Sequence, residues 1–369
     1  MIENILKTCL NDLVFIGIKK NKKLKIENYT KEDVFEVPIL LSDIKSGVKE
    51  GNYSEEIGTK EILKAMGILL GVDMDFKYKS AYEDFIKTHI DKVFNFYKYM
   101  AKSLYEDGKV YQAYAILNYL KNKYQDDIEI KLIWAIVGES IYNENFENLS
   151  EKEKDFILKE IIKSYEEVIK LDKNNDIAHI KLGIINSNLK NYVKANLYFE
   201  KALNISKDDG KKEMIRSYLE EIESPARLEA AEAYIAYGKF DQALQQLERV
   251  QDKNQQNSTY YYYLSICQLK LGIYDEASIN IDKAIDLEEN PEYINHKALI
   301  KLSQNDKKSA IEIYKKAAEK GNDFTILYNL GVLYMSECFE KEALEAFKKA
   351  YEIKKDPELK KIMENIKIN

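Results

Sequence analysis

The chain has 369 residues, of which 45% are hydrophobic and 32% are charged, and its formal net charge is −7. This composition is typical of a folded protein and excludes a largely disordered chain. The acidic balance argues against a general nucleic-acid binder, which usually has a basic face. With only 14 glycines and 4 prolines in the chain, long helices are favoured over a strand-and-turn protein.

The first residues, MIENILKTCLNDL, lack the order of a secretory signal because Glu3 and Asp12 interrupt any apolar stretch. No window approaches about 18 uninterrupted apolar residues, so we expect no membrane insertion. Cys9, Cys267 and Cys338 lie far apart and form no CxxC pair, which is typical of inert thiols in a reducing compartment. A cytoplasmic location follows as the expectation.

Residues 1–75 predict a small α+β cap. The β-prone runs FIGIKK and KLKIEN flank Asn21-Lys22, which predicts a hairpin. VFEVPILL follows as a third strand, which Pro38 would confine to a sheet edge or to the strand's end. Apolar residues at helical spacing predict a helix over residues 54–70.

Five lysines between positions 19 and 25 form a basic cluster in this acidic chain. The cluster would suit an acidic partner or a phosphate backbone. It is also typical of a solvated hairpin tip, where lysines discourage pairing between exposed strand edges. Of these two interpretations we favour the solvated turn.

The segment from Phe324 to Pro357 contains two short helical patterns with apolar spacings of three and four, which mark one helical face. The first pattern carries Leu330, Gly331 and Tyr334, and the second carries Ala343, Phe347 and Ala350. The small residues Gly331 and Ala343 would let two antiparallel helices approach closely. The segment resembles a tetratricopeptide repeat, a 34-residue helix–turn–helix unit that buries its apolar face by stacking on further copies.

The same register extends over much of the chain. Small or apolar residues of the second helix recur at Ala113, Ile161, Ala195, Ala243, Ala277, Ala310 and Ala343, at intervals of 48, 34, 48, 34, 33 and 33 residues. Both longer intervals coincide with extra residues, the polar stretch 142–153 and the amphipathic segment 210–223. The resemblance therefore implies an all-α, right-handed superhelical solenoid of repeats over residues 80–369.

Local signals predict where several helices begin and end. Gly108 suits the turn that ends a first helix. Ser150 and Glu153 form a capping box that would start a helix. Ser224-Pro225 reads as an N-cap followed by a first-turn proline, which predicts a new helix at that point. A polar-faced terminal helix, residues 357–368, would seal the end of the solenoid.

The sequence carries no recognisable catalytic centre. Its only histidines, His89, His179 and His296, lie alone in different helical segments, whereas metal and nucleophilic sites need convergent groups. HExxH, GxSxG and glycine-rich phosphate-loop motifs are missing. We therefore expect no enzyme activity, no metal and no cofactor.

In such a solenoid the first helices of the repeats line a concave groove. The candidate binding residues there are mostly apolar or aromatic: Ile180, Ile184, Tyr262, Ile266, Leu269, Asn295, Leu299, Tyr328, Val332 and Met335. Family members that clasp a C-terminal carboxylate carry a Lys/Asn/Arg set at these positions, and that pattern is missing here. The four rings of Tyr260–Tyr263 would point in different directions on a helix, and we expect only Tyr262 in the groove.

An apolar groove of this kind would take an amphipathic helix or an extended peptide. It could instead be filled by insertions of the chain itself or by a second copy. The sequence predicts a non-catalytic adaptor or scaffold that binds a protein or peptide segment, and no nucleic acid. The alternatives are a peptide-sensing regulator whose N-terminal region is the effector, and a homo-oligomeric structural protein.

Overall fold

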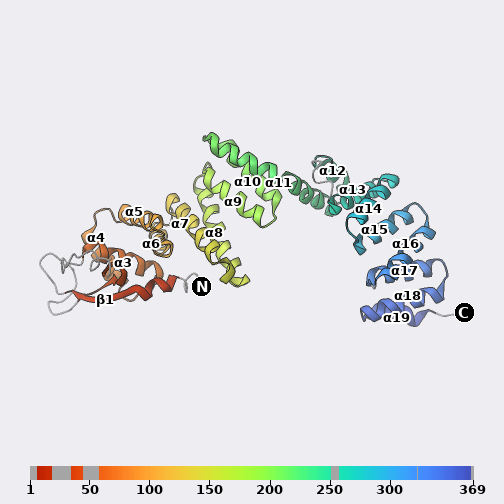
Figure 1. Cartoon of the computed structure of the whole chain (residues 1–369), viewed down its shortest axis with the longest axis horizontal. Helices are drawn as coiled ribbons and strands as arrows, with labels where there is room; N and C mark the ends of the chain where they lie inside the picture. The colour runs from red at the N-terminus through yellow and green to blue at the C-terminus, as the bar shows by residue number, and fades with distance from the viewer. Residues whose placement is uncertain (1–5, 19–34, 45–57, 251–256, 322, 367–369) are drawn as a thin grey trace. The chain divides into compact units, whose positions relative to one another are not determined.

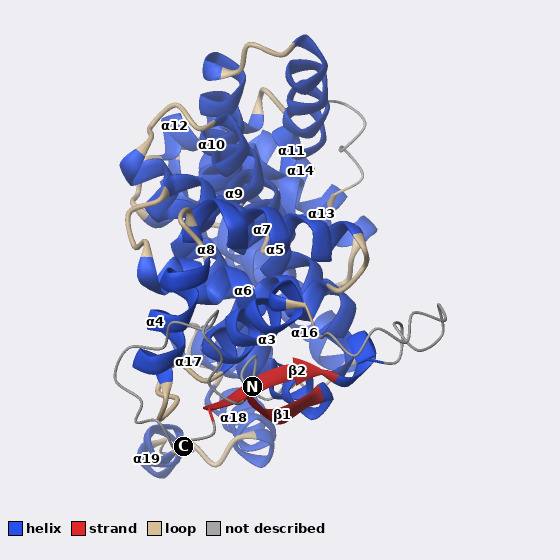
Figure 2. Ribbon diagram, turned by 90° about the vertical axis from the view of Figure 1, so that its left-hand side faces the viewer, coloured by secondary structure: helices blue, strands red, loops and turns tan. Residues whose placement is uncertain are grey.

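The computed structural model describes residues 6–18, 35–44, 58–250, 257–321 and 323–366 (Figure 1). Helices dominate these residues, and the sheet found among them has two short strands (Figure 2). The chain divides into two compact units, one comprising residues 1–185 and 201–212 and the other residues 186–200 and 213–369. The expected fold class, helical repeats behind a small N-terminal α+β segment, is confirmed.

The N-terminal sheet is antiparallel. Its elements are a 3-10 helix (Thr8–Asp12), β1 (Leu13–Ile18) and β2 (Phe35–Leu40). Pro38 lies opposite Phe15 in the register. Because the sheet has two strands within the described residues, both strands are edges, where proline is tolerated. The predicted turn at Asn21-Lys22 and the whole lysine cluster lie outside the described residues.

Helix α3 (Thr59–Val72) joins this sheet to the first repeat. It packs on β2 and on α6 (Val110–Lys123). Gly71 permits the approach to α6, because a Cβ at this position would lie 1.7 Å from the carbonyl oxygen of Ala115. Asn118 of α6 donates a hydrogen bond of 3.2 Å to the Gly71 carbonyl. A domain boundary near residue 75 stays a prediction, since α3 shares its contacts with both sides.

The first unit continues with helical hairpins. Its further helices are α4 (Lys79–His89), α5 (Val93–Glu106), α7 (Ile128–Asn145) and α8 (Glu151–Leu171), with a short 3-10 helix (Phe146–Asn148) between the last two. The capping box is confirmed, because Ser150 and Glu153 bond reciprocally at the start of α8. Helices α9 (Asp176–Asn188) and α10 (Tyr192–Ile205) follow in the sequence, and each is divided between the two units.

The prediction of a helix start at Ser224-Pro225 is wrong. Helix α11 (Asp209–Ala236) runs without a break through Pro225, which lies in its interior. A proline costs about 3 kcal/mol in a helix interior because it lacks an amide hydrogen and clashes with the preceding turn. Ile215 and Ile222 are buried before the proline, and burying one isoleucine stabilises by roughly 1.5–3 kcal/mol. Packing therefore outweighs the local preference.

The second unit contains regular hairpins that stack in order. After α11 its helices are α12 (Phe240–Leu247), α13 (Ser258–Lys270), α14 (Tyr274–Leu287), α15 (Pro291–Ser303), α16 (Lys307–Lys320), α17 (Phe324–Ser336), α18 (Glu340–Ile353) and α19 (Pro357–Asn365). The predicted small positions of the second helices are fully buried. Gly331 permits the close packing of the last hairpin, because a Cβ there would lie 2.5 Å from the Phe347 ring. The closing helix α19 packs on α18 and buries Leu359.

The turns inside the hairpins share one backbone feature. A residue with positive φ stands two positions before the second helix at Gly108, Lys190, Gly238, Gly272, Asn305 and Cys338. This left-handed conformation is the usual end of a helix and favours glycine. Three of these turns therefore carry a side chain where glycine would be less strained.

Candidate functional site

Three stacked first helices, α13, α15 and α17, carry most of the predicted groove residues. Contacts join α13 to α15 and α15 to α17. Equivalent positions lie 33 residues apart and form three rows: Tyr262, Asn295 and Tyr328; Ile266, Leu299 and Val332; Leu269, Leu302 and Met335. We call these nine residues the first-helix face. Within each helix they stand at spacings of four and three, so they share one side of that helix.

The exposed part of the first-helix face is apolar. Leu299, Val332 and Met335 expose 42%, 44% and 37% of their surface. Leu299 and Val332 are equivalent residues of neighbouring repeats, and Met335 follows Val332 by about one turn. Single exposed apolar residues are common on proteins. Three on contacting helices instead form one patch.

Tyr262 is half-buried and serves both the core and the surface. Its ring lies 4.7 Å from that of Tyr293 and 5.4 Å from that of His296, centroid to centroid. Its hydroxyl donates a hydrogen bond of 2.9 Å to Glu292. Burial and this carboxylate raise the pKa of Tyr262. The phenol therefore stays neutral and holds Glu292 at the edge of the face.

Asn295 lies in the middle of a polar layer between repeats. Its side-chain oxygen accepts hydrogen bonds of 2.6 Å from Tyr314 and 2.7 Å from Asn329. Burial raises the pKa of Tyr314 to about 12, so this hydroxyl remains a donor. The layer links α15, α16 and α17, and Asn295 is thus engaged in the structure of the face.

The remaining predicted groove residues are less exposed than Leu299, Val332 and Met335. Tyr328 is half-buried, with its ring centroid 5.9 Å from that of Phe324 and 5.8 Å from that of Phe347. Ile266, Leu269 and Leu302 are half-buried as well. Ile180 is buried and Ile184 half-buried on α9, and both belong to the first unit. The face in the second unit is therefore built without them.

The tyrosine run divides between two cores. Tyr260 and Tyr263 pack against the cluster of Ala231, Ala243, Leu247 and Cys267. Tyr261 and Tyr262 pack against the cluster that includes Ala277 and Ile281. Four consecutive rings on a helix point in different directions, and here two neighbouring hairpins each take two of them.

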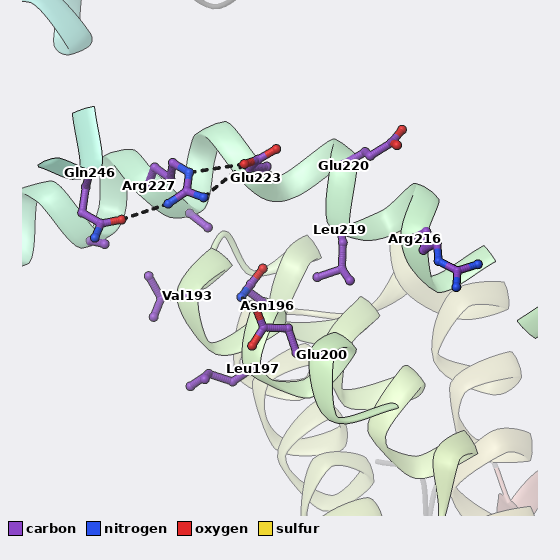
Figure 3. A pocket seen from close by; sticks show the side chains of 12 residues that line it. Val193, Asn196, Leu197, Glu200, Arg216, Leu219, Glu220, Glu223, Arg227 and Gln246 are labelled. Atoms are coloured by element: carbon purple, nitrogen blue, oxygen red, sulfur yellow. Dashed lines mark hydrogen bonds and ion pairs between the residues drawn. The ribbon is translucent and has the colours of Figure 1, made fainter. Parts of the chain in front are cut away.

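A second surface, which the sequence did not indicate and which mixes apolar with charged side chains, lies between α10 and α11. It is a cleft of about 490 Å³ in the second unit. Leu197 is 62% exposed there, and Leu219 projects from α11 toward α10 (Figure 3). Arg227 is held by hydrogen bonds of 3.1 Å to Glu223 and to Gln246 (Figure 3). The cleft depends on the extra segment 210–223, which lengthens α11.

The titratable groups do not form a reaction centre among the residues that the structure describes, where no cluster of three metal-binding side chains occurs. His89 contacts the carbonyl of Phe85, and His179 that of Lys173. His296 is buried, and its burial lowers the pKa to about 4. Burial likewise raises the pKa of the Cys9 and Cys267 thiols to about 11. The neutral forms of His296, Cys9 and Cys267 are therefore favoured near pH 7.

None of the described helices has the length and apolar character needed to cross a membrane.

Solved structures of helical-repeat proteins resemble the chain at low sequence identity. The C-terminal part of a tetratricopeptide repeat-containing protein from Cytophaga hutchinsonii is 16% identical, with a TM-score of 0.41 over 74% of this chain and 100% of that one. A tetratricopeptide repeat protein from Parabacteroides merdae is 14% identical, with a TM-score of 0.34 over 73% and 97%. Yeast Tom70 is 13% identical, with a TM-score of 0.36 over 94% and 66%. The search of curated proteins found no match.

Two tetratricopeptide-repeat family models match the sequence itself. One covers residues 220–265 and the other residues 291–319. Both segments coincide with hairpins of the second unit, whose second helices bury the small residues Ala243 and Ala310. These two segments of the second unit are therefore tetratricopeptide-like repeats, in agreement with the repeat register read from the sequence.

Proposed function

We propose that this chain is a non-catalytic adaptor that binds a peptide or protein segment on the first-helix face of its second unit. One observation carries the proposal: Leu299, Val332 and Met335 are exposed on contacting first helices. Contiguous apolar surface on a soluble protein commonly marks an interaction site. The half-buried Tyr262, Asn295 and Tyr328 would form the rigid edge of that site, because each is already fixed by neighbours.

The chemistry of the face favours an apolar ligand over a terminal carboxylate. The nine residues of the face include no lysine or arginine. The charged group held at its edge is Glu292, through Tyr262. A carboxylate-ended peptide would find no cation among the face residues, whereas leucine or aromatic side chains would bury the exposed apolar surface.

The test compares the full chain with a Leu299→Ser/Val332→Ser variant and a matched Ile279→Ser control. Ile279 is also an exposed apolar residue, but it lies on the second helix α14. Each protein would be used to capture partners from native lysate, and the captured protein would then be titrated by calorimetry. The double variant should bind at least about 100-fold more weakly, since each buried side chain contributes roughly 1.5–3 kcal/mol.

Equal affinity of wild type and the double variant would overturn the proposal. So would an equal loss in the Ile279→Ser control, because that result would place the partner elsewhere. If the wild type captures only itself and sediments as a dimer that the double variant abolishes, the face belongs to a homo-oligomer instead.

A further inference from the structure

A separate groove follows helix α5 in the first unit. It has a volume of about 500 Å³ and lies between one side of α5 and the first turns of α3. The residues of α5 and its two caps that line it are Lys92, Asn95, Phe96, Tyr99, Met100, Ser103, Leu104 and Asp107. Their spacing marks one continuous helical side about 22 Å long. We call this surface the α5 groove.

The equivalent side of a later first helix shows what this surface normally packs against. Phe96 and Met100 stand 14 and 10 residues before the first residue of α6, as Ile326 and Leu330 do before the first residue of α18. Ile326 and Leu330 are buried in a core with Ala310 and Tyr314 of the preceding helix, α16. The α5 side is therefore the surface on which the second helix of a preceding repeat would stack.

No repeat hairpin precedes α5 in the described chain. Helix α4 instead directs Tyr82 and Phe85 against Phe35 of β2. Tyr99 on the α5 side is 74% exposed, whereas Met100 and Leu104 beside it are buried. Met100 and Leu104 thus form an apolar floor of the groove, and the exposed ring of Tyr99 lies at its middle. Both belong to the side of α5 on which a helix would stack.

The charges at the groove are mainly positive. Lys60, Lys92 and Lys109 are exposed, and within the described residues none of them forms an ion pair. Three other lysines of α3 and α5 are paired: Lys64 with Asp43, Lys98 with Glu129 and Lys102 with Glu106.

Two acidic groups also line the groove. The Glu61 carboxylate folds back onto the first turn of α3, since a Cβ on Gly58 would lie 2.2 Å from its Oε2. Asp107 remains at the far end. The three unpaired lysines therefore exceed the acidic groups that face a ligand, although the chain as a whole carries a net charge of −7.

We propose that the α5 groove docks an amphipathic helix of a partner protein, with acidic residues flanking the apolar stripe of that helix. The helical shape follows from the stacking surface, because the equivalent side of α17 is covered by a helix. The acidic flanks follow from Lys60, Lys92 and Lys109, which would steer and pair with them. The apolar stripe would cover Tyr99 and the floor around it.

The probe is a displayed library of amphipathic helices of about 18 residues. Its apolar stripe is fixed as leucine, and the flanking positions are drawn from Asp, Glu, Lys, Arg and Ser. After selection on the full-length wild type, Asp and Glu should be enriched at the flanks. A selected peptide should bind a Lys92→Glu/Lys109→Glu variant, and separately a Tyr99→Ala variant, about tenfold or more weakly by fluorescence anisotropy.

Two matched controls should bind the selected peptide as the wild type does. Lys102→Glu changes an exposed lysine on the same helix but outside the groove. Tyr237→Ala removes an exposed tyrosine from the second unit. Because all the changed side chains are exposed, circular dichroism should show unchanged helix content.

The proposal is overturned if selection enriches basic or uncharged flanks, or yields no binder. It is also overturned if the Tyr99→Ala and lysine variants bind the selected peptide like the wild type. A third contrary result is sedimentation of the wild type as a dimer that Tyr99→Ala dissociates, because a second copy would then occupy the groove. The first-helix face variants leave this surface untouched, so the two proposals fail independently.

Discussion

The hairpins α17–α18 and α7–α8 share one repeat plan but hold their helices together differently. In α17–α18, a Cβ on Gly331 would lie 2.5 Å from the Phe347 ring. In α7–α8, a Cβ on Gly138 would meet nothing closer than 3.3 Å. Ile161 of α8 takes the repeat position that Ala343 takes in α18. Close helix approach therefore needs a small residue on both helices, and a single glycine does not produce it.

The strongest test of this comparison is a pair of glycine substitutions. Gly331→Ala should destabilise the second unit by about 2–3 kcal/mol, because the methyl group must displace the Phe347 ring. Gly138→Ala should change stability by less than about 1 kcal/mol, since the gain in helix propensity offsets the small shift that Tyr114, 3.3 Å from the added Cβ, would have to make. Hydrogen exchange of peptides from α17 and α7 would report each effect locally. Equal effects of the two substitutions would contradict the comparison.

Acid should loosen the α13–α15 region through His296. Burial lowers the pKa of this imidazole from 6.5 to about 4, and its Nε2 has no hydrogen-bond partner among the described residues. Between these two pKa values the unfolded chain binds the proton and the folded chain does not. Stability should therefore fall as the pH drops from 6.5 to about 4, by at most roughly 3 kcal/mol.

The groups nearest His296 define the control for the acid test. Lys270 lowers its pKa further and Glu292 raises it. A His296→Leu variant should lose most of the acid dependence measured by denaturant unfolding between pH 7 and pH 4.5, relative to the wild type. An unchanged slope of stability against pH in that variant would show that other groups dominate.

Substitutions at the left-handed residue of a hairpin turn should change stability less, and one of them should stabilise the protein. Cys338 adopts φ 59° in the last hairpin, whereas Gly272 adopts φ 79° in α13–α14. Cys338→Gly should stabilise its hairpin by about 1 kcal/mol, and Gly272→Ala should destabilise its own by a similar amount. Thermal unfolding followed by circular dichroism would show opposite shifts in Tm. Shifts of the same sign would show that backbone strain at this position does not account for the difference between the two turns.

The smallest expected effect concerns a phenol in the first unit. Tyr114 stacks on Trp134 with centroids 5.1 Å apart, and in the part of the chain that the structure describes its buried hydroxyl has no hydrogen-bond partner. Tyr114→Phe should therefore be neutral or stabilising by up to about 1 kcal/mol. Trp134 is the only tryptophan of the chain, so its fluorescence reports unfolding of this region alone. A loss of stability would reveal a partner for the hydroxyl.

The repeat register was predictable because it depends on local spacing. Small residues such as Ala195, Ala277 and Ala343 recur at nearly constant intervals, and the structure buries each of them completely. The capping box at Ser150 follows equally local rules and is present. Pro225 shows the limit of such rules, because its local signal for a helix start was overridden by burial on both sides of the proline.

The candidate surfaces were less predictable, since exposure depends on what neighbouring elements cover. Spacing placed Tyr262 and Val332 on the same side of their helices, yet Tyr262 is half-buried and Val332 is exposed. The difference comes from Tyr293 and Glu292, which reach Tyr262 from the next repeat. The α5 groove and the α10–α11 cleft had no sequence signal, because each arises from an irregular neighbour.

The contact of Gly71 with Ala115 has a practical consequence for cutting the chain. Helix α3 fills the side of α6 that faces it, and Tyr97 of α5 donates a hydrogen bond of 2.7 Å to the Leu63 carbonyl. A fragment beginning at residue 80 would thus leave α6 bare and the Tyr97 hydroxyl without its acceptor. Such a truncation should aggregate or unfold locally rather than yield an isolated repeat array. The N-terminal helix α3 is therefore part of the packing of the first repeat.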